Sequence, residues 1–179
     1  MTKISSSCTK RKDKHPLEAA EQRIAWAWLG TVPVKSDHPL AWGTLQDFAY
    51  MVPNGTNLAG TGKRRAIQMA NLKSQGLRTG VSDLVIAYPT YQEGYHGMGG
   101  GADATGYFGA YIEMKRVREA YNGPAAIKSA VRPEQVKWLM RMASVGYWVG
   151  LAYGAEEFKT LIGMYLRGEK NPDYLVIQE

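Results

Sequence analysis

Three charged residues in the middle of the chain, Asp83, Glu113 and Lys115, have types and a spacing that could support catalysis with a metal ion. Mg²⁺ prefers hard oxygen ligands, commonly one or two carboxylates together with a substrate phosphate. A metal ion held in this way makes water a usable nucleophile, and a nearby lysine can orient that water or offset charge in the transition state. The alternative is a structural ion pair, because clustered charges also arise without catalysis.

The segment that carries Glu113 and Lys115 has the pattern of a half-buried strand that ends at residue 116. Successive side chains of a strand alternate between its two faces. One face is predicted to carry Tyr107, Tyr111, Glu113 and Lys115. The other is predicted to carry Phe108, Ala110, Ile112 and Met114. A carboxylate and a lysine are therefore expected to share one face of a strand, where they form either an edge ion pair or part of a reactive site.

The flanking segments predict the elements that must position these residues. Hydrophobic periodicity, glycines and prolines predict alternating helices and strands. In chain order they are a helix over 17–29, a strand over 45–52, a basic helix within 60–76, a strand over 83–88, the strand ending at 116, a helix from 133, a strand over 147–153 and a helix over 155–167. Loops or polar excursions are predicted over 31–43, 89–105 and 117–132. This order indicates an α/β fold with a mixed central sheet flanked by helices.

Two glutamates of the first predicted helix are further candidates for the site. Glu21 falls on the apolar stripe formed by Leu17, Ile24 and Trp28, which faces inward in this prediction. Glu18 lies on an adjacent stripe with Gln22, four residues later. A solvated helix carboxylate is the alternative for either residue.

Composition favours a polyanionic partner. Lys and Arg number 22 against 16 Asp and Glu, which gives a net charge of +6 and a pI near 9.4. The basic side chains of the 60–76 segment are either a solvated helix face or a surface that contacts DNA phosphates; they are Lys63, Arg64, Arg65 and Lys73.

The 179 residues suit one domain over 17–170. A flexible basic tail over 1–16 and a short tail over 171–179 are expected at its ends. The single cysteine cannot form an internal disulfide, and no apolar run approaches the length of a bilayer span. No apolar segment follows the basic N-terminus as it would in a secretory signal. We therefore expect a soluble, cytoplasmic protein without membrane contact.

Several familiar motifs are absent. The segment 60–64 lacks residues that a phosphate-binding loop requires, and the glycine run 97–102 lacks the preceding strand and following helix of a dinucleotide site. Three scattered histidines and one cysteine give no zinc spacing. The serines have no partnered histidine that would indicate a nucleophile triad.

Several spaced motifs resemble the VRR-NUC family, the virus-type replication-repair nucleases of the PD-(D/E)XK restriction-endonuclease-like superfamily. In chain order they are Pro53-Asn54-Gly55, Gly62-Lys63-Arg64, the run 72–84, Ile112-Glu113-Met114-Lys115-Arg116 and Pro133-Glu134-Gln135. The likeness extends from about Leu17 to Leu166.

The resemblance implies a restriction-endonuclease-like fold and assigns roles to the candidate residues. Asp83 and Glu113 would bind Mg²⁺ or Mn²⁺, with the carbonyl of Met114 as a further ligand. Lys115 would be the catalytic lysine and Gln135 an assisting residue. The family also tends to place a first-helix glutamate near the metal: Glu18 fits its spacing better, and Glu21 fits the inward stripe better.

By the same resemblance we expect a metal-dependent DNA endonuclease. Phage origin in a bacterial host cell, a homodimer and branched or Holliday-junction DNA follow as further expectations. Ser82 replaces the proline usual before the aspartate, which should leave ligation intact. An insertion separates Asp83 from Glu113, and with the 117–132 segment it bears on substrate choice. The rival hypotheses are a non-catalytic DNA-binding module of a replication complex and an enzyme that holds a nucleotide in the 94–106 loop.

Overall fold

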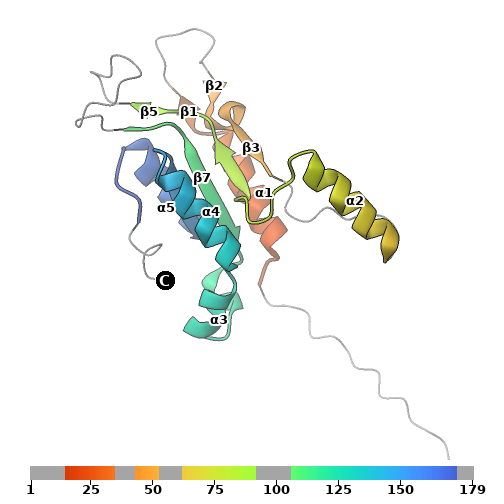
Figure 1. The fold of residues 1–179 in the computed structure, drawn as a ribbon. Helices are drawn as coiled ribbons and strands as arrows, with labels where there is room; N and C mark the ends of the chain where they lie inside the picture. The colour runs from red at the N-terminus through yellow and green to blue at the C-terminus, as the bar shows by residue number, and fades with distance from the viewer. Residues whose placement is uncertain (1–14, 35–42, 53–61, 92–105, 173–179) are drawn as a thin grey trace, which may run out of the picture.

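The computed structural model describes residues 15–34, 43–52, 62–91 and 106–172, and its centre is a four-stranded mixed sheet (Figure 1). Its strand order is β3 (Ala49–Met51), β4 (Leu84–Ile86), β7 (Ala110–Lys115) and β8 (Trp148–Tyr153). Neighbours from β3 to β7 are antiparallel, whereas β7 and β8 run parallel. Two small antiparallel pairs lie outside this sheet: β1 (Pro33–Val34) with β2 (Gly43–Thr44), and β5 (Thr90–Tyr91) with β6 (Gly106–Tyr107).

Helices cover both faces of the central sheet. The described helices are α1 (Glu18–Leu29), α2 (Lys63–Ser74), α3 (Pro124–Ser129), α4 (Pro133–Ala143) and α5 (Ala155–Leu166), with short 3₁₀ turns η2 (Leu45–Phe48) and η3 (Arg118–Ala120). Parallel strands need a long crossover, and η3, α3 and α4 form the one between β7 and β8. Side chains of α1 and α5 pack on one face of the sheet, and α4 packs on the other. The α2 helix buries no residue and projects from the body of the molecule (Figure 1).

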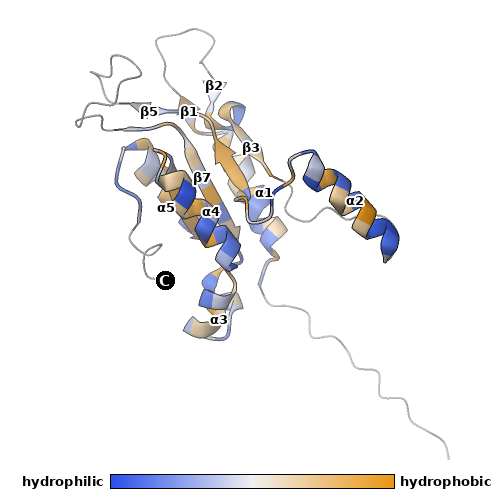
Figure 2. Ribbon diagram, in the orientation of Figure 1, coloured by the Kyte–Doolittle hydropathy of each residue, from blue (hydrophilic) through white to orange (hydrophobic). Residues whose placement is uncertain are grey.

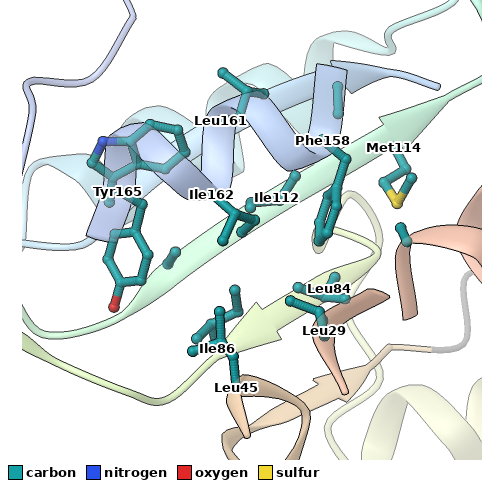
Figure 3. Close-up of a cluster of buried hydrophobic side chains, with 14 of the residues drawn as sticks. Leu29, Leu45, Leu84, Ile86, Ile112, Met114, Phe158, Leu161, Ile162 and Tyr165 are labelled. Atoms are coloured by element: carbon teal, nitrogen blue, oxygen red, sulfur yellow. The ribbon is translucent and has the colours of Figure 1, made fainter. Parts of the chain in front are cut away.

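The main core lies between the sheet and the α1–α5 layer (Figure 3). Ile112 and Met114 of β7 point into it, where Phe158 and Ile162 of α5 are fully buried. A smaller cluster on the opposite face joins Leu139 of α4 to the sheet. The β8 strand is buried along its whole length, and the free edge beside it is covered by the segment after α5. There the backbone N–H of Val149 donates to the Asn171 side chain at 2.9 Å.

The predicted alternation of side chains is confirmed within β7 and is wrong just before it. Tyr111 packs with the α4 cluster and Ile112 with the main core, as expected. Tyr107, however, packs against the main core, and the Phe108 ring lies 6.1 Å from that of Tyr147, beside Tyr111. The chain leaves regular strand geometry at residues 108–109, between β6 and β7, so the alternation does not carry across this break.

A strand was predicted over 45–52, but its first half is the 3₁₀ turn η2 and only Ala49–Met51 is strand. The reason is a local capping box. The carboxylate of Asp47 accepts the backbone N–H of Thr44 at 2.7 Å and its hydroxyl at 3.0 Å. Short polar side chains that bond to nearby backbone in this way compete with strand pairing.

The polar excursion predicted over 117–132 contains η3 and the helix α3. Pro124 opens α3 at a position where its missing N–H is harmless, and Gly123 before it has φ +86°. The 31–43 and 89–105 segments form short strands where the structure describes them, and the 53–55 turn and the 94–106 loop, apart from Gly106, lie outside the described residues. In the described residues no helix is both long and apolar enough to span a bilayer.

Candidate active site

Asp83 and Glu113 come from neighbouring antiparallel strands and lie opposite each other. Leu84 of β4 pairs with Ile112 of β7, so one further step along the ladder places Asp83 against Glu113. The Asp83 carboxylate accepts the backbone N–H of Met114 at 2.9 Å. Its backbone carbonyl accepts the N–H of Val52 at 2.8 Å, which ties it to the β3 side of the sheet as well. Three segments of the sheet therefore fix the position of this carboxylate.

Glu113 is fully buried, and only one of its two carboxylate oxygens has partners. Oε1 accepts hydrogen bonds from the Lys115 ammonium and from the side-chain amide of Gln135. Oε2 is buried and has no hydrogen-bond partner among the described residues. Buried acceptors of this kind are rare in folded proteins, and one beside a second carboxylate indicates a position for a cation.

The electrostatics of Glu113 follow from this arrangement. Burial, and then the negative charge of Asp83, raise the pKa of the Glu113 carboxyl from 4.5 to about 8, although Lys115 opposes the shift. Desolvation and a like charge both disfavour the ionised form. A divalent cation between the two carboxylates would remove that penalty.

Lys115 is held as a cation beside Glu113. Burial alone would lower the pKa of its ammonium, but the charge of Glu113 and the hydrogen bond to it, with smaller contributions from Glu18 and Asp83, raise it above the usual value. The side chain is buried at the end of β7. Lys115 is therefore suited to stabilise negative charge and not to act as a general base.

Gln135 reaches the site from the first turn of α4. Its side-chain carbonyl accepts the backbone N–H of Arg132 at 2.9 Å, which is half of a capping box, and its amide donates to Glu113. Pro133 starts the helix, so the chain direction there is set by local sequence. One side chain thus caps the helix and orients the Glu113 carboxylate.

The two glutamates of α1 have different surroundings. The Glu18 carboxylate lies 3.9 Å from the Lys115 ammonium and is 39% exposed. Burial raises the pKa of Glu18, as does the charge of Asp83, while Lys115 lowers it. Glu21 is buried, and its carboxylate accepts the backbone N–H of Ala155 at 2.8 Å, which caps the start of α5. Of the two, Glu18 lies beside Lys115, and Glu21 is engaged with a helix end.

The inward stripe predicted for α1 also differs from the structure. Its buried residues are Glu21, Ala25 and Leu29, four apart, whereas Leu17 and Ile24 are exposed. The helix is turned so that small Ala25 faces the core, which lets α1 pack closely against α5.

The donor set fits a divalent cation with hard oxygen ligands. Asp83 and Glu113 supply carboxylates. The carbonyl of Met114 points to the same side of β7 as the N–H that Asp83 accepts, because the two groups of one strand residue share a side. No group of three or more histidine, cysteine, aspartate or glutamate side chains in the described residues is close enough to hold a metal. A site with two carboxylates matches Mg²⁺, which completes its shell with water and substrate phosphate.

The basic residues predicted on the 60–76 helix lie on α2, which buries no residue. Lys63, Arg64 and Arg65 are exposed in the first turn of α2, and Lys73 is in its last turn. About 15 Å of helix separates Lys63 from Lys73. Figure 2 shows hydrophilic residues along this projecting helix, with hydrophobic ones between them.

Two residues near the site were not selected from the sequence. Arg132 contributes a charge that lowers the pKa of Glu18, and Arg116 donates to the backbone carbonyls of His15 and Pro16. The hydrogen bonds from Arg116 fix the chain just before α1. Arg116 and these two residues are about 100 positions apart in sequence, so no local signal could have indicated the contact.

A search with protein-family models gives no match, and a search of curated proteins gives none either. Among solved structures, one described as a "VRR_NUC domain protein" has a TM-score of 0.55 and 20% sequence identity to this chain. The similarity covers 89% of this chain and 95% of the other. It shows a shared fold and confirms the predicted restriction-endonuclease-like α/β architecture, with its mixed sheet and flanking helices.

Proposed function

We propose that this chain is a Mg²⁺- or Mn²⁺-dependent DNA endonuclease of the VRR-NUC family. The observation that carries the proposal is the convergence of Asp83, Glu113 and Lys115 at one end of β7, with an unpartnered buried oxygen on Glu113. The ordered sequence motifs and the name of the structural neighbour support the nuclease assignment.

Asp83, Glu113 and the Met114 carbonyl would hold the metal ion. When bound, it would neutralise charge on the scissile phosphate and lower the pKa of water. The protein's own groups prepare the site. Asp83 is fixed by the Met114 N–H, and Gln135 with Lys115 holds Oε1 of Glu113, so that Oε2 is the oxygen left for a cation.

Lys115 supplies positive charge at the reacting phosphate. Its raised pKa keeps the ammonium protonated, so it can bind a phosphate oxygen and stabilise charge that develops during hydrolysis. Glu18, 3.9 Å from the ammonium, would help to position it. The basic residues of α2, including Lys63 and Arg64, would bind the DNA backbone outside the site.

Further details of the proposal rest on the family resemblance. They are a preference for branched or Holliday-junction DNA, a homodimeric state, and a role in phage replication, recombination or repair inside a bacterial cell. A panel of linear, nicked, flap and four-way DNA tests the preference, and the mass of the protein in solution tests the dimer.

The central test is cleavage by wild type, Asp83→Asn, Glu113→Gln and Lys115→Met with Mg²⁺. Each substitution removes one charge from the site, and we expect each to lower the rate by about 100-fold or more. Lys159→Gln is the matched control, because Lys159 pairs with Glu156 on the exposed surface of α5. Cleavage by all three site variants at the wild-type rate would contradict the site. DNA binding without cleavage by wild type would favour a non-catalytic binding module.

A further inference from the structure

A basic cavity lies between the end of α2 and α4, outside the carboxylate site. Its volume is about 450 Å³, within the range of about 300–1,000 Å³ that holds small molecules. Its walls come from the last turn of α2, the 77–79 segment and the exposed side of α4, and the lining residues are Lys73, Leu77, Arg78, Thr79, Glu134, Lys137, Trp138 and Arg141.

Four cationic side chains and one carboxylate surround this cavity. None of Lys73, Arg78, Lys137 and Arg141 forms an ion pair with a carboxylate in the described part of the chain. These four positive charges repel one another across the cavity. An anion that enters the cavity is attracted by all four side chains and relieves this repulsion. The Glu134 carboxylate opposes this attraction but leaves the lining strongly positive.

Trp138 gives the cavity an aromatic wall. Its ring packs edge-on against Tyr111, with centroids 6.2 Å apart, which holds the indole in place. Its indole N–H is buried and has no acceptor among the described residues. Cations interleaved with an aromatic ring are the features that bind single-stranded nucleic acid, where bases stack and phosphates are neutralised.

The cavity adjoins the candidate active site. Trp138 is three residues from Gln135 on α4, so the two side chains are neighbours on the helix. Gln135 contacts Glu113 while Trp138 contacts Tyr111, and these two β7 residues lie about 7 Å apart on one strand face. The 77–79 segment that lines the cavity is followed in the chain by Gly80 and then by Asp83. Gly80 packs against the backbone of Glu134.

We infer that this cavity binds a nucleotide of an unpaired DNA strand next to the bond that is cut. The inference rests on the proposed nuclease function and extends it. Arg78, Lys137 and Arg141 hold the phosphate, and the base stacks on Trp138. A duplex would meet the exposed basic residues of α2, whereas a base in this hollow must be free of its partner. The substrate class is accordingly DNA with a single-stranded segment, such as a flap.

The test measures binding without metal, so that it is independent of cleavage. Fluorescence anisotropy in EDTA would compare a labelled oligothymidylate with a blunt duplex of the same length. Arg141→Gln and Trp138→Leu are expected to weaken single-strand binding about fivefold or more and to change duplex binding less than twofold. Glu134→Gln should strengthen single-strand binding, because it removes the one negative charge. Lys159→Gln, with the same charge change on α5, should stay within about twofold of wild type.

Each outcome decides the inference. Unchanged single-strand binding by Arg141→Gln overturns it even if Trp138→Leu is poorly folded, and equal losses on duplex and single strand overturn it as well. If Lys159→Gln loses as much as Arg141→Gln, general charge and not the cavity explains binding. Cleavage assays with Mg²⁺ separate this result from the proposed function. If wild type cleaves DNA but the cavity variants bind single strands normally, the nuclease function stands and the cavity inference is wrong. If binding depends on the cavity but wild type does not cleave, the cavity inference stands and the nuclease function is wrong.

Discussion

At the scale of single residues, the unusual feature is a pair of buried carboxylates, Asp83 and Glu113, on neighbouring strands. One carboxylate oxygen of Glu113, Oε1, accepts hydrogen bonds from both Lys115 and Gln135. The negative charge of Asp83 also acts on the Glu113 carboxylate. Burial of two like charges close together destabilises the folded chain. Functional sites commonly retain such strain because the ligand relieves it.

The stability of metal-free protein should depend on the proton carried by Glu113. Its pKa is 4.5 as an ordinary carboxyl and about 8 in the fold. Between these values the folded chain retains a proton that the unfolded chain has released, so this group's contribution to the free energy of unfolding falls as pH rises. We expect Glu113→Gln to gain stability relative to wild type as pH rises from 5 to 8 in EDTA, by about 1 kcal/mol or more. Thermal melts of both proteins measure it, and a constant difference would contradict it.

Glu18 and Glu21 should separate catalysis from stability. Glu21→Ala leaves the buried N–H of Ala155 without its acceptor, so we expect the free energy of unfolding to fall by about 1–3 kcal/mol. Glu18→Ala removes a half-exposed side chain and should change stability by less than about 0.5 kcal/mol while lowering cleavage. Urea melts and cleavage rates measure the two effects. The opposite pattern, with Glu21 needed for cleavage and Glu18 for stability, would reverse the assignment.

At the scale of elements, the site depends on how closely the segment before β4 passes the start of α4. Gly80 is buried there with φ +82°, and an added Cβ would lie 2.7 Å from the Glu134 carbonyl. Three residues later the chain places Asp83, while Gln135 follows Glu134 on α4. The close contact between Gly80 and Glu134 therefore brings the segment that carries Asp83 next to the helix that carries Gln135.

Substitution of Gly80 tests that approach. Gly80→Ala adds both a strained backbone conformation and a clash, so we expect a loss of about 2 kcal/mol or more in stability, with reduced cleavage. Gly123→Ala is the matched control, because Gly123 has φ +86° but nothing within 4 Å of an added Cβ. It should show only the backbone penalty, on the order of 1–3 kcal/mol at φ +86° and ψ 177°, and should lose less stability than Gly80→Ala. Equal losses in the two variants would show that the approach to Glu134 is unimportant.

At the scale of the whole molecule, positive charge is distributed unevenly. The net charge is +6, and α2 projects from the body with its basic first turn exposed. A helix that buries no residue adds little to the stability of the core, so its composition reflects contact with a partner or with water. Positive charge on this exposed helix can hold a DNA backbone.

The salt dependence of DNA binding should therefore decrease when α2 loses charge. With Lys63→Gln and Arg64→Gln combined, we expect the slope of log K against log salt to become shallower by about 0.9 for each phosphate that the variant no longer neutralises. Stability should be unchanged, because both side chains are exposed. A double variant of Lys159→Gln and Lys170→Gln removes equal charge elsewhere and should leave the slope nearly unchanged. Equal changes in both double variants would mean that net charge alone sets the affinity.

Much of this architecture was predictable because its signals are local. Alternation within β7 placed Glu113 and Lys115 on one face, and Pro133 marked the start of α4. The strand predicted from residue 45 was wrong in its first half because Thr44 and Asp47 form a local hydrogen bond. The alternation predicted before β7 was wrong because residues 108–109 depart from regular strand geometry. In those places the alternation of residue types no longer matched the backbone.

The sequence by itself determined the types of the candidate site residues, their spacing on β7 and the order of elements, since each depends on neighbours in the chain. Only the tertiary structure decided that Asp83 lies opposite Glu113, that Glu18 approaches Lys115 while Glu21 caps α5, and that Trp138 borders a basic cavity. These arrangements join residues that are tens of positions apart. Their geometry depends on strand register and helix rotation, which packing sets for the molecule as a whole.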